Sequence, residues 1–305
     1  MAVGDTINAN DPFAALRTSM NTILNGTGVH GGYNQGHSIS ANPSSGNVID
    51  DAYFDSLRSA AVKIANYYNI TQPFPAVNAG DTVKWADYAG AAATFKSNIE
   101  TRFNSPWSHS SGWDMTTATE TTQSVSNWNG TRTQVVKVAF GSTANMNAWF
   151  AAGGEVRVSM SHNDTTSNQQ GTSWEQLTSE MGTYRFSVRP TDSTTLDAST
   201  RKKYSDLTTS WTYVKREYAD DADYSANYAD IAAYISGSDL YIQTRLVDAH
   251  SARSGSGSGY GGAWSWTGHD TATGTSTVNV SSLKLSNASG SVNLTNPTFT
   301  ITDNL

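Results

Sequence analysis

Residues 134–188 constrain the fold most, because alternating apolar runs there are separated by two helical patterns. Apolar and polar residues alternate over 134–140, 155–160 and 183–188, and side chains two positions apart in a strand share a face. The stretches 142–150 and 173–182 instead repeat apolar residues every three or four positions, which is typical of a helix with one buried side. The segment therefore predicts a sheet with one buried and one wet face, decorated by two short helices.

Caps at both ends of these helices support the same prediction. Glycines follow each helical pattern, at Gly153-Gly154 and at Gly182, where positive φ angles stop a helix at little cost. Thr172 and Ser173 stand three positions before Glu175 and Gln176, a spacing that fits a capping box. The second helix is therefore expected to begin at about residue 172.

The first third of the chain contains three amphipathic helical patterns with a similar introduction. Gly4-Asp-Thr-Ile7, Gly46-Asn-Val-Ile49 and Gly80-Asp-Thr-Val83 each precede one pattern, which we interpret as a degenerate internal repeat. Each apolar stripe is too narrow for an isolated helix, so the helices pack together within the chain or against a neighbouring subunit. The residues predicted to make these packing or oligomer contacts are Phe13, Leu16, Phe54, Leu57 and Tyr88. A long Gly-rich loop over 26–46 separates the first two patterns.

Strand patterns dominate the rest of the chain. They lie at 211–218, 228–235, 240–247, 276–285 and 291–301, with a hairpin turn between 235 and 240. The predicted fold class is α+β, with an antiparallel β-sandwich-like domain after an amino-terminal helical region. We assign residues 1–105 to the helical region, 106–130 to a junction, and 131–305 to the mainly β domain.

Composition excludes several classes of function. The net charge of −7 disfavours nucleic acid as a partner, since phosphate binding needs clustered lysine and arginine. Cysteine is absent, which removes disulfides and thiolate chemistry and argues against a zinc finger or an iron–sulfur site. The chain has no run of about 18 apolar residues, so the sequence does not predict membrane insertion. The amino terminus lacks the pattern of a secretory signal. Charged residues make up only 15% of the chain, against roughly 25% in typical soluble domains, which favours extensive packing contacts.

No residue pattern predicts catalysis, a cofactor or a metal. The histidines are scattered among Gly, Ser and Asn without ligand spacing and are expected to be solvated: His30, His37, His109, His162, His250 and His269. Asp220, Asp221, Asp223 and Asp230 offer clustered carboxylates for calcium, but the spacing of a calcium-binding loop is missing, so we interpret them as a solvated turn. The chain is therefore predicted not to be an enzyme.

One stretch suggests recognition. Residues 254–262 are rich in Gly and Ser, and Tyr260, Trp264 and Trp266 lie in or just after them. Flat amphipathic rings of this kind contact sugars or partner proteins, but alternating tryptophans also line the inner face of a strand. Core packing, a protein interface and glycan contact therefore remain three alternatives for this loop.

The sequence also resembles a known class of protein. The segment Phe150-Ala-Ala-Gly-Gly-Glu-Val-Arg-Val-Ser159, the later residues 174–177 and 181–186, and the opening residues 1–9 and 31–36 carry the likeness. They are similar to segments of virion structural proteins of tailed phages, particularly those of marine cyanobacterial phages. The resemblance covers most of residues 1–250 and does not extend into the tail after 250.

The resemblance implies a non-enzymatic structural component of a virion, in the tail, baseplate, collar or fibre attachment. The expected partners are copies of the chain itself in a symmetric homo-oligomer and other virion proteins. The expected location is the virion, after assembly in the host cytoplasm. The alternative is a glycan-binding receptor-recognition module of a tail fibre or adhesin, using Tyr260, Trp264 and Trp266.

Overall fold

A computed structural model describes most of the chain, which divides into two compact units. The described residues are 12–25, 39, 51–68, 71–76, 85–104, 115–151, 153–188, 191–250, 254–259, 262–267, 271–285 and 295–305. The helical unit comprises Met1–Thr116, Ser142–Gly154 and Lys284–Thr295, and the β unit comprises Thr117–Gly141, Glu155–Leu283 and Asn296–Leu305. The predicted α+β class, with an amino-terminal helical region followed by sheets that are mainly antiparallel, is confirmed. A parallel pair joins the fourth and fifth strands of the chain.

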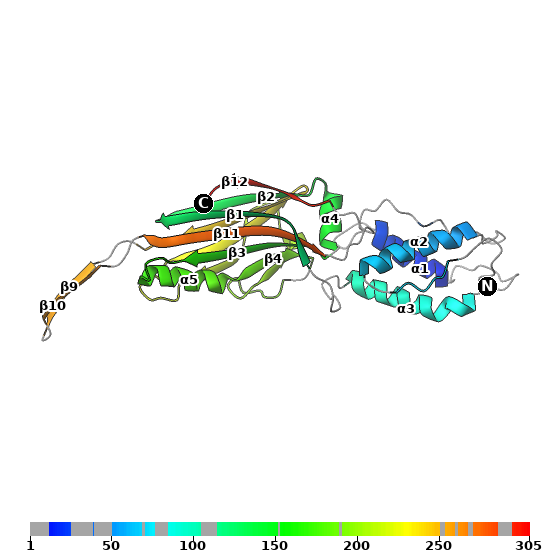
Figure 1. Cartoon of the computed structure of the whole chain (residues 1–305), viewed down its shortest axis with the longest axis horizontal. Helices are drawn as coiled ribbons and strands as arrows, with labels where there is room; N and C mark the ends of the chain where they lie inside the picture. Colours follow the sequence, from blue (N-terminus) through cyan, green and yellow to red (C-terminus); the bar gives the residue numbers. More distant parts are fainter. Residues whose placement is uncertain are drawn as a thin grey trace. The chain divides into compact units, whose positions relative to one another are not determined.

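Three helices form the core of the helical unit. They are α1 (Pro12–Asn25), α2 (Asp51–Tyr68) and α3 (Trp85–Asn104), and each contacts the other two (Figure 1). α1 begins at a proline, which loses nothing at the first helical position because that N–H has no partner within the helix. Their apolar positions recur every three or four residues and form one buried cluster, which includes Leu16, Met20, Phe54, Leu57, Phe95 and Ile99. The three helices therefore pack together within one chain.

Several sequence predictions for this unit lie outside the described residues. Phe13 and Tyr88 belong to α1 and α3, but their side chains are not described, and neither are the three introductory segments. Ile39 is described within the Gly-rich loop: it is buried in the helical core, and its backbone N–H donates to Asn21 Oδ1 at 3.2 Å. This unit also includes α4 (Thr143–Ala151), whose Met146, Trp149 and Phe150 are buried as the helical pattern predicted.

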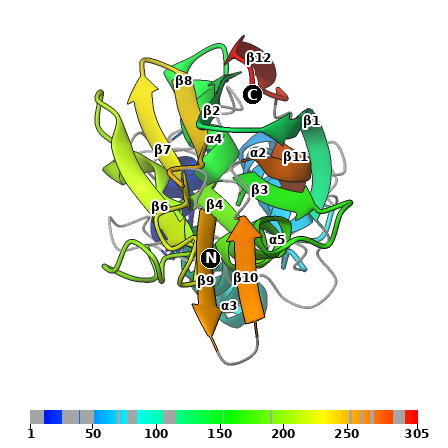
Figure 2. The same cartoon turned by 90° about the vertical axis from the view of Figure 1, so that its left-hand side faces the viewer.

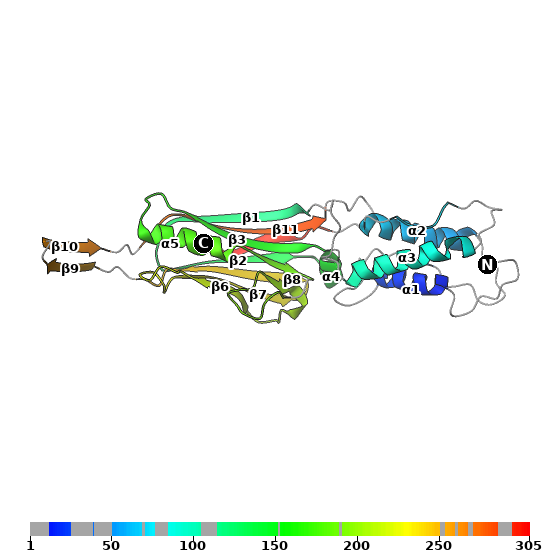
Figure 3. The same ribbon diagram turned by 90° about the horizontal axis from the view of Figure 1, so that it is seen from below.

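Two five-stranded sheets form the body of the β unit and lie as two layers (Figures 2 and 3). Sheet A has the strand order β1 (Met115–Trp128), β11 (Ala272–Leu285), β3 (Glu155–Asn163), β4 (Thr183–Ser187) and β5 (Arg201–Lys203). Sheet B has the order β12 (Thr298–Asp303), β2 (Thr131–Ala139), β8 (Asp239–Val247), β7 (Tyr228–Ser236) and β6 (Thr212–Tyr218). A short 3-10 helix, η1 (Tyr204–Asp206), precedes β6.

Alternation along the strands determines which side of each sheet is buried. In β8, Leu240, Ile242, Thr244 and Leu246 are buried, whereas the residues that alternate with them are partly exposed. In β3, Val156 and Val158 are buried and pair across to Phe186 and Tyr184 of β4. Each sheet therefore has an apolar face toward the interior and a second face toward solvent, as the sequence predicted.

Helix α5 (Gln169–Met181) contacts β3 of sheet A and β6 and β7 of sheet B. Its Trp174 is buried and meets Trp128 of β1 edge to face, with the ring centroids 4.7 Å apart. Gly182 ends the helix at φ 56°, and Gly153 follows α4 at φ 81°, so both predicted helix stops are confirmed.

The predicted start of α5 is wrong. The helix begins at Gln169, and its cap is Asn168, whose Oδ1 accepts from the Gly171 N–H at 2.7 Å. Thr172 and Ser173 are therefore inside the helix, where Ser173 is buried. Asparagine is as good a cap as serine or threonine. The earlier start was not predicted because Asn168 follows a polar loop without an apolar pattern.

The predicted junction over 106–130 also needs correction, because much of it is strand β1. β1 pairs with β11 at the edge of sheet A and lacks the apolar alternation that predicts a strand. Cross-strand hydroxyl contacts accompany its backbone pairing, with Ser124 Oγ 2.9 Å from Thr277 Oγ1 and Ser126 Oγ 2.9 Å from Thr275 Oγ1. Residues 105–114 lie outside the described part of the chain.

The later strand predictions are largely confirmed. β6, β7 and β8 match the patterns at 211–218, 228–235 and 240–247, and Gly237 at φ 61° makes the hairpin turn between β7 and β8. β11 begins at Ala272, four residues before its pattern, and β12 occupies only the end of the last one. Among the described helices, none is both long enough and apolar enough to cross a membrane.

Candidate functional site: an aromatic sheet face and a hydroxyl-lined pocket

The outer face of sheet B carries a cluster of aromatic side chains, which we call the aromatic face. Trp211, Tyr213 and Tyr218 are the exposed large hydrophobic residues of the described chain, at 42%, 45% and 46% exposure. Strand pairing brings the partly exposed rings of β7 and β8 to the same side. The aromatic face consists of Trp211, Tyr213, Tyr218, Tyr228, Tyr234 and Tyr241.

The register of three neighbouring strands produces this cluster. Tyr218 of β6 pairs with Tyr228 of β7, and Tyr234 of β7 pairs with Tyr241 of β8. Residues an even number of positions apart on a regular strand lie on the same face. Tyr228 and Tyr234 of β7 are six positions apart, so both tyrosine pairs lie on one face of the sheet. A bulge between Tyr213 and Lys215 allows β6 to present Tyr213 on the aromatic face while Lys215 is buried.

The rings contact one another in two groups. Tyr234 and Tyr241 stack with their ring planes only 2° apart and centroids at 4.6 Å, and Trp211 meets Tyr234 edge to face, also at 4.6 Å. Tyr218 and Tyr228 lie 5.5 Å apart at the other end. These contacts hold flat rings in place on a rigid sheet, which lowers the entropic cost of binding another molecule.

A buried ion cluster lies between the two ring groups. Asp230 of β7 is completely buried, and its carboxylate accepts from Arg245 Nε at 2.9 Å and from Arg216 Nη2 at 2.8 Å. The Arg216 guanidinium also lies 4.6 Å from the Tyr228 ring centroid and 5.1 Å from that of Tyr213. Burial opposes the charge on Arg216, but hydrogen bonds to Asp230 and Tyr218 outweigh it, so the pKa of Arg216 is raised.

This cluster leaves the aromatic face with a surplus of positive charge. Two guanidiniums share one carboxylate, and both arginine side chains keep roughly a quarter of their surface exposed, at 24% and 22%. Lys137 and Asp239, 2.7 Å apart at the edge of the face, neutralise each other. The face is therefore cationic on a chain whose net charge is −7.

A pocket of about 450 Å³ lies beside the aromatic face. Its walls come from Tyr184 of β4, the loop 191–200, Lys202 of β5, and Tyr213 and Val214 of β6. Hydroxyl groups line it, from Tyr184, Thr191, Ser193, Thr194, Thr195 and Ser199. Tyr213 belongs to both the pocket lining and the aromatic face, so the two features form one continuous site.

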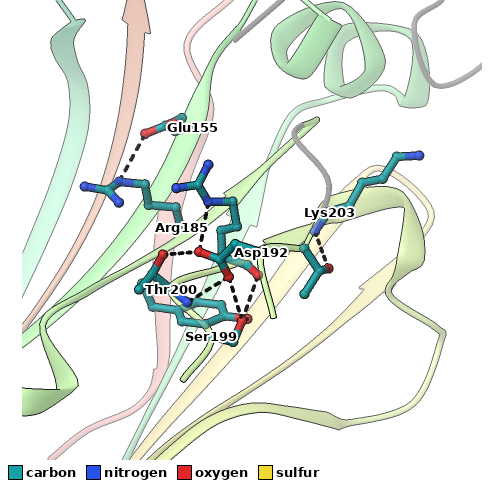
Figure 4. A network of polar contacts seen from close by, with 9 residues as sticks. Glu155, Arg185, Asp192, Ser199, Thr200 and Lys203 are labelled. Atoms are coloured by element: carbon teal, nitrogen blue, oxygen red, sulfur yellow. Dashed lines mark hydrogen bonds and ion pairs between the residues drawn. The ribbon is translucent and has the colours of Figure 1, made fainter. Parts of the chain in front are cut away.

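A hydrogen-bond network around Asp192 holds the pocket loop (Figure 4). The Asp192 carboxylate accepts from the Ser199 hydroxyl at 3.3 Å, the Thr200 N–H at 3.1 Å and the Thr200 hydroxyl, and it lies 3.2 Å from Arg201 Nε. Burial opposes ionisation of this carboxyl, but the Thr200 hydrogen bonds and the Arg201 charge outweigh it, so its pKa is lowered. Lys215 anchors the same loop by donating to the Asp197 carbonyl and the Glu217 carboxylate.

The base of the pocket is a buried phenol. Tyr184 Oη and Ser199 Oγ lie 3.4 Å apart and share a hydrogen bond, and burial raises the pKa of Tyr184 to about 12. This hydroxyl therefore stays protonated at neutral pH and acts as a neutral hydrogen-bonding group. The chemistry of the pocket is that of a polar binding site.

The structure places the sequence-predicted recognition residues elsewhere. Trp264 and Trp266 belong to β10 (Gly262–Thr267), which pairs with β9 (Ser254–Gly259) as a separate two-stranded ribbon. Trp264 pairs with Gly257 and Trp266 with Gly255, so the position opposite each tryptophan carries no side chain. Tyr260 and the side chains of both tryptophans lie outside the described residues.

Leu16, Phe54 and Leu57, predicted as packing or oligomer contacts, are buried in the helical core of one chain. The acidic residues do not form the cluster weighed for calcium. Asp230 is bound to two arginines, whereas Asp221 and Asp223 accept from the Gln169 amide. Within the described residues, no group of acidic and histidine side chains has the arrangement of a metal site.

Two of the histidines expected to be solvated are buried. His250 is 6% exposed and packs against Tyr224, with ring centroids 4.7 Å apart. His162 of β3 is 7% exposed, with Nε2 2.9 Å from the Thr273 carbonyl and Nδ1 2.8 Å from Ser276 Oγ. Trp128 Nε1 donates to the same Ser276 oxygen at 2.9 Å, which completes a buried polar chain. The other four histidines lie outside the described residues.

Acid is expected to weaken the β unit through His162. Burial lowers its pKa below the ordinary 6.5, although the Thr273 hydrogen bond and the charges of Asp164 and Glu175 oppose this. The unfolded chain therefore binds the proton more readily, and stability present above pH 6.5 is lost as the pH falls toward the native pKa. Urea unfolding between about pH 7.5 and about pH 5 should show this decline. The decline should be smaller in His162→Gln, and equal slopes in the two proteins would contradict the assignment.

Sequence reasoning missed the aromatic face, although its strands were predicted. Part of the signal was present, because Trp211 and Tyr213, and likewise Tyr228 and Tyr234, are an even number of positions apart. Tyr213 and Tyr218 are five positions apart, and only the bulge in β6 brings both to one face. The pocket had no comparable signal, because its Ser/Thr loop resembles the many other Ser/Thr-rich stretches of the chain.

No protein-family model, curated protein or solved structure matches this chain.

Proposed function

We propose that this chain is a non-enzymatic structural component of a tailed-phage virion that acts through oligomeric protein–protein contacts. The resemblance carried by residues 150–159, 174–177 and 181–186 supports the virion assignment. The observation that carries the contact function is the β9–β10 ribbon.

The outer edges of the ribbon have backbone N–H and C=O groups that no third described strand pairs with. β9 and β10 pair with each other over six residues and with no third strand among the described residues. An isolated two-stranded hairpin is marginally stable in water, and its outer edges present unpaired backbone N–H and C=O groups. Identical ribbons from several copies satisfy these groups by pairing with one another, as a symmetric homo-oligomer requires.

The composition of the ribbon fits such an interface. β9 consists only of serine and glycine, so another backbone can approach closely, and β10 contains two tryptophans, a residue type enriched at protein interfaces. No charged residue occurs in either strand, so identical copies do not repel each other there.

Removing the ribbon is expected to abolish self-association. Residues 254–267 are replaced by a short flexible linker, and light scattering coupled to size-exclusion chromatography gives the mass. The full chain should elute as a multiple of the 32.6 kDa chain mass and the variant as a monomer. Tyr218→Ala, an exposed aromatic residue outside the ribbon, is the matched control and should keep the parent mass.

A full-length chain that remains monomeric at all concentrations would contradict the homo-oligomer. The virion assignment has a separate test: quantitative mass spectrometry of purified particles should find the protein in a fixed copy number greater than one. Recovery only outside assembled particles would contradict it.

A further inference from the structure

We propose that the pocket beside β6, together with Tyr213 and the adjoining part of the aromatic face, binds an acidic saccharide. This site is distinct from the ribbon residues Tyr260, Trp264 and Trp266, and the proposal goes beyond the structural role. Three observations support it: the hydroxyl lining, the ring at the rim, and the surplus positive charge.

The lining of the pocket matches a polyol. Hydroxyl groups both donate and accept, so several of them around a pocket of about 450 Å³ complement the hydroxyls of a sugar ring. Ser199 and Tyr184 are buried and fixed by the Asp192 network, which preorganises the base of the pocket. Among the described residues, the side chains of Thr194, Thr195 and Lys202 make no hydrogen bond or ion pair and remain available to a ligand.

Tyr213 provides a stacking surface at the rim. Its ring is 45% exposed, yet it is held by Arg216 at 5.1 Å and Arg245 at 5.0 Å. A fixed, flat and amphipathic ring suits the apolar face of a sugar. The remaining rings of the aromatic face continue from Tyr213 along the sheet, so a saccharide chain that enters the pocket has further rings to contact.

The charge of the site selects an acidic ligand. Lys202 contributes to the pocket one cation that has no ion-pair partner among the described residues, and Arg201 offsets the charge of Asp192 in the lining. The Arg216–Asp230–Arg245 cluster contributes one surplus positive charge to the face. The rest of the chain is acidic, so this positive potential is local. Carboxylated and sulfated sugars both supply the complementary charge.

Affinity electrophoresis tests the proposal with the full chain at about 0.15 M salt, where exposed charges are screened. Native gels contain alginate as a carboxylated polymer, carrageenan as a sulfated polymer, dextran as a neutral polymer, or polyglutamate as an acidic peptide. Alginate or carrageenan should retard the protein more than dextran or polyglutamate, and the stronger of the two identifies the acidic group.

Point variants link retardation to this site. Tyr213→Ala should weaken the binding of the retarding polymer about tenfold, or ~1.4 kcal/mol, whereas Tyr213→Phe keeps the ring and should retain binding. Lys202→Gln should weaken binding, and Lys96→Gln, which makes the same charge change in α3, should not.

Three results would overturn the proposal. The first is equal mobility in acidic and neutral polysaccharide. The second is retardation by polyglutamate alone, which would identify an acidic protein as the occupant. The third is retardation that Tyr213→Ala and Lys202→Gln leave unchanged.

Discussion

Replacing Trp174 by alanine is expected to lower the free energy of unfolding of the β unit by about 3–5 kcal/mol. The side chain is 1% exposed on α5, packs edge to face on Trp128, and belongs to the helix that contacts β3, β6 and β7. Removing it leaves a cavity that the surrounding strands cannot close without breaking their own pairing. Urea titration followed by circular dichroism measures the change.

Trp211→Ala is the matched control for Trp174→Ala. Trp211 is 42% exposed on the aromatic face, so its loss removes less buried area than the loss of Trp174 and should cost less. Trp174→Phe keeps most of the buried ring and should cost less than the alanine change. Equal losses in Trp174→Ala and Trp211→Ala would show that α5 does not complete the core.

Asp230→Asn is expected to destabilise the β unit by roughly 3 kcal/mol, the lower end of the range for breaking a buried ion pair. The carboxylate is fully buried and is bound by Arg216 and Arg245, so the amide leaves two guanidiniums facing each other without a counter-ion. The arginines keep about a quarter of their surface in water, which relieves part of the repulsion. Denaturant unfolding gives the magnitude.

Asp239→Asn provides the comparison for Asp230→Asn. It removes the partner of Lys137 in a pair whose side chains are 32% and 20% exposed, and such pairs contribute about 0–1 kcal/mol. The double variant Asp230→Asn/Arg216→Leu should be less destabilised than the sum of its single changes, because one uncompensated charge is then gone. Additive losses would contradict the shared-carboxylate arrangement.

The two proposals about function depend on different parts of the β unit. The ribbon of β9 and β10 is proposed to bind other copies of the chain, and the pocket with Tyr213 to bind an acidic saccharide. A monomeric protein that still binds alginate through Tyr213 would remove the first proposal and leave the second. An oligomer that binds no acidic polymer would do the reverse.

Local sequence patterns predicted much of the fold. The alternation in β2, β3 and β8 and the three- to four-residue spacing in α1, α2 and α3 each report which side of one element is apolar. Strand β1 was not predicted because its serine and threonine residues show no apolar alternation. The stability of β1 depends on its pairing with β11. The early start of α5 was not predicted because the cap Asn168 lies within a polar loop.

The candidate site was less accessible from the sequence. Tyr260, Trp264 and Trp266 were predicted as a recognition loop because they are close together in the sequence. The rings of the aromatic face come from three strands, and the pocket joins residues of β4, β5 and β6 to the loop 191–200. No short window of sequence contains either feature.

Local sequence patterns specify the order and type of most elements and the buried side of each, and the composition rules out cysteine chemistry. These properties depend on neighbours within a few positions along the chain. Which faces meet and which side chains share a site follows from the packing of the folded chain. Asp230 of β7 binds Arg216 of β6 and Arg245 of β8. His162 is linked to Trp128 through Ser276, which lies on a strand far away in sequence. Such contacts depend on register between remote segments, and register is a property of the folded chain.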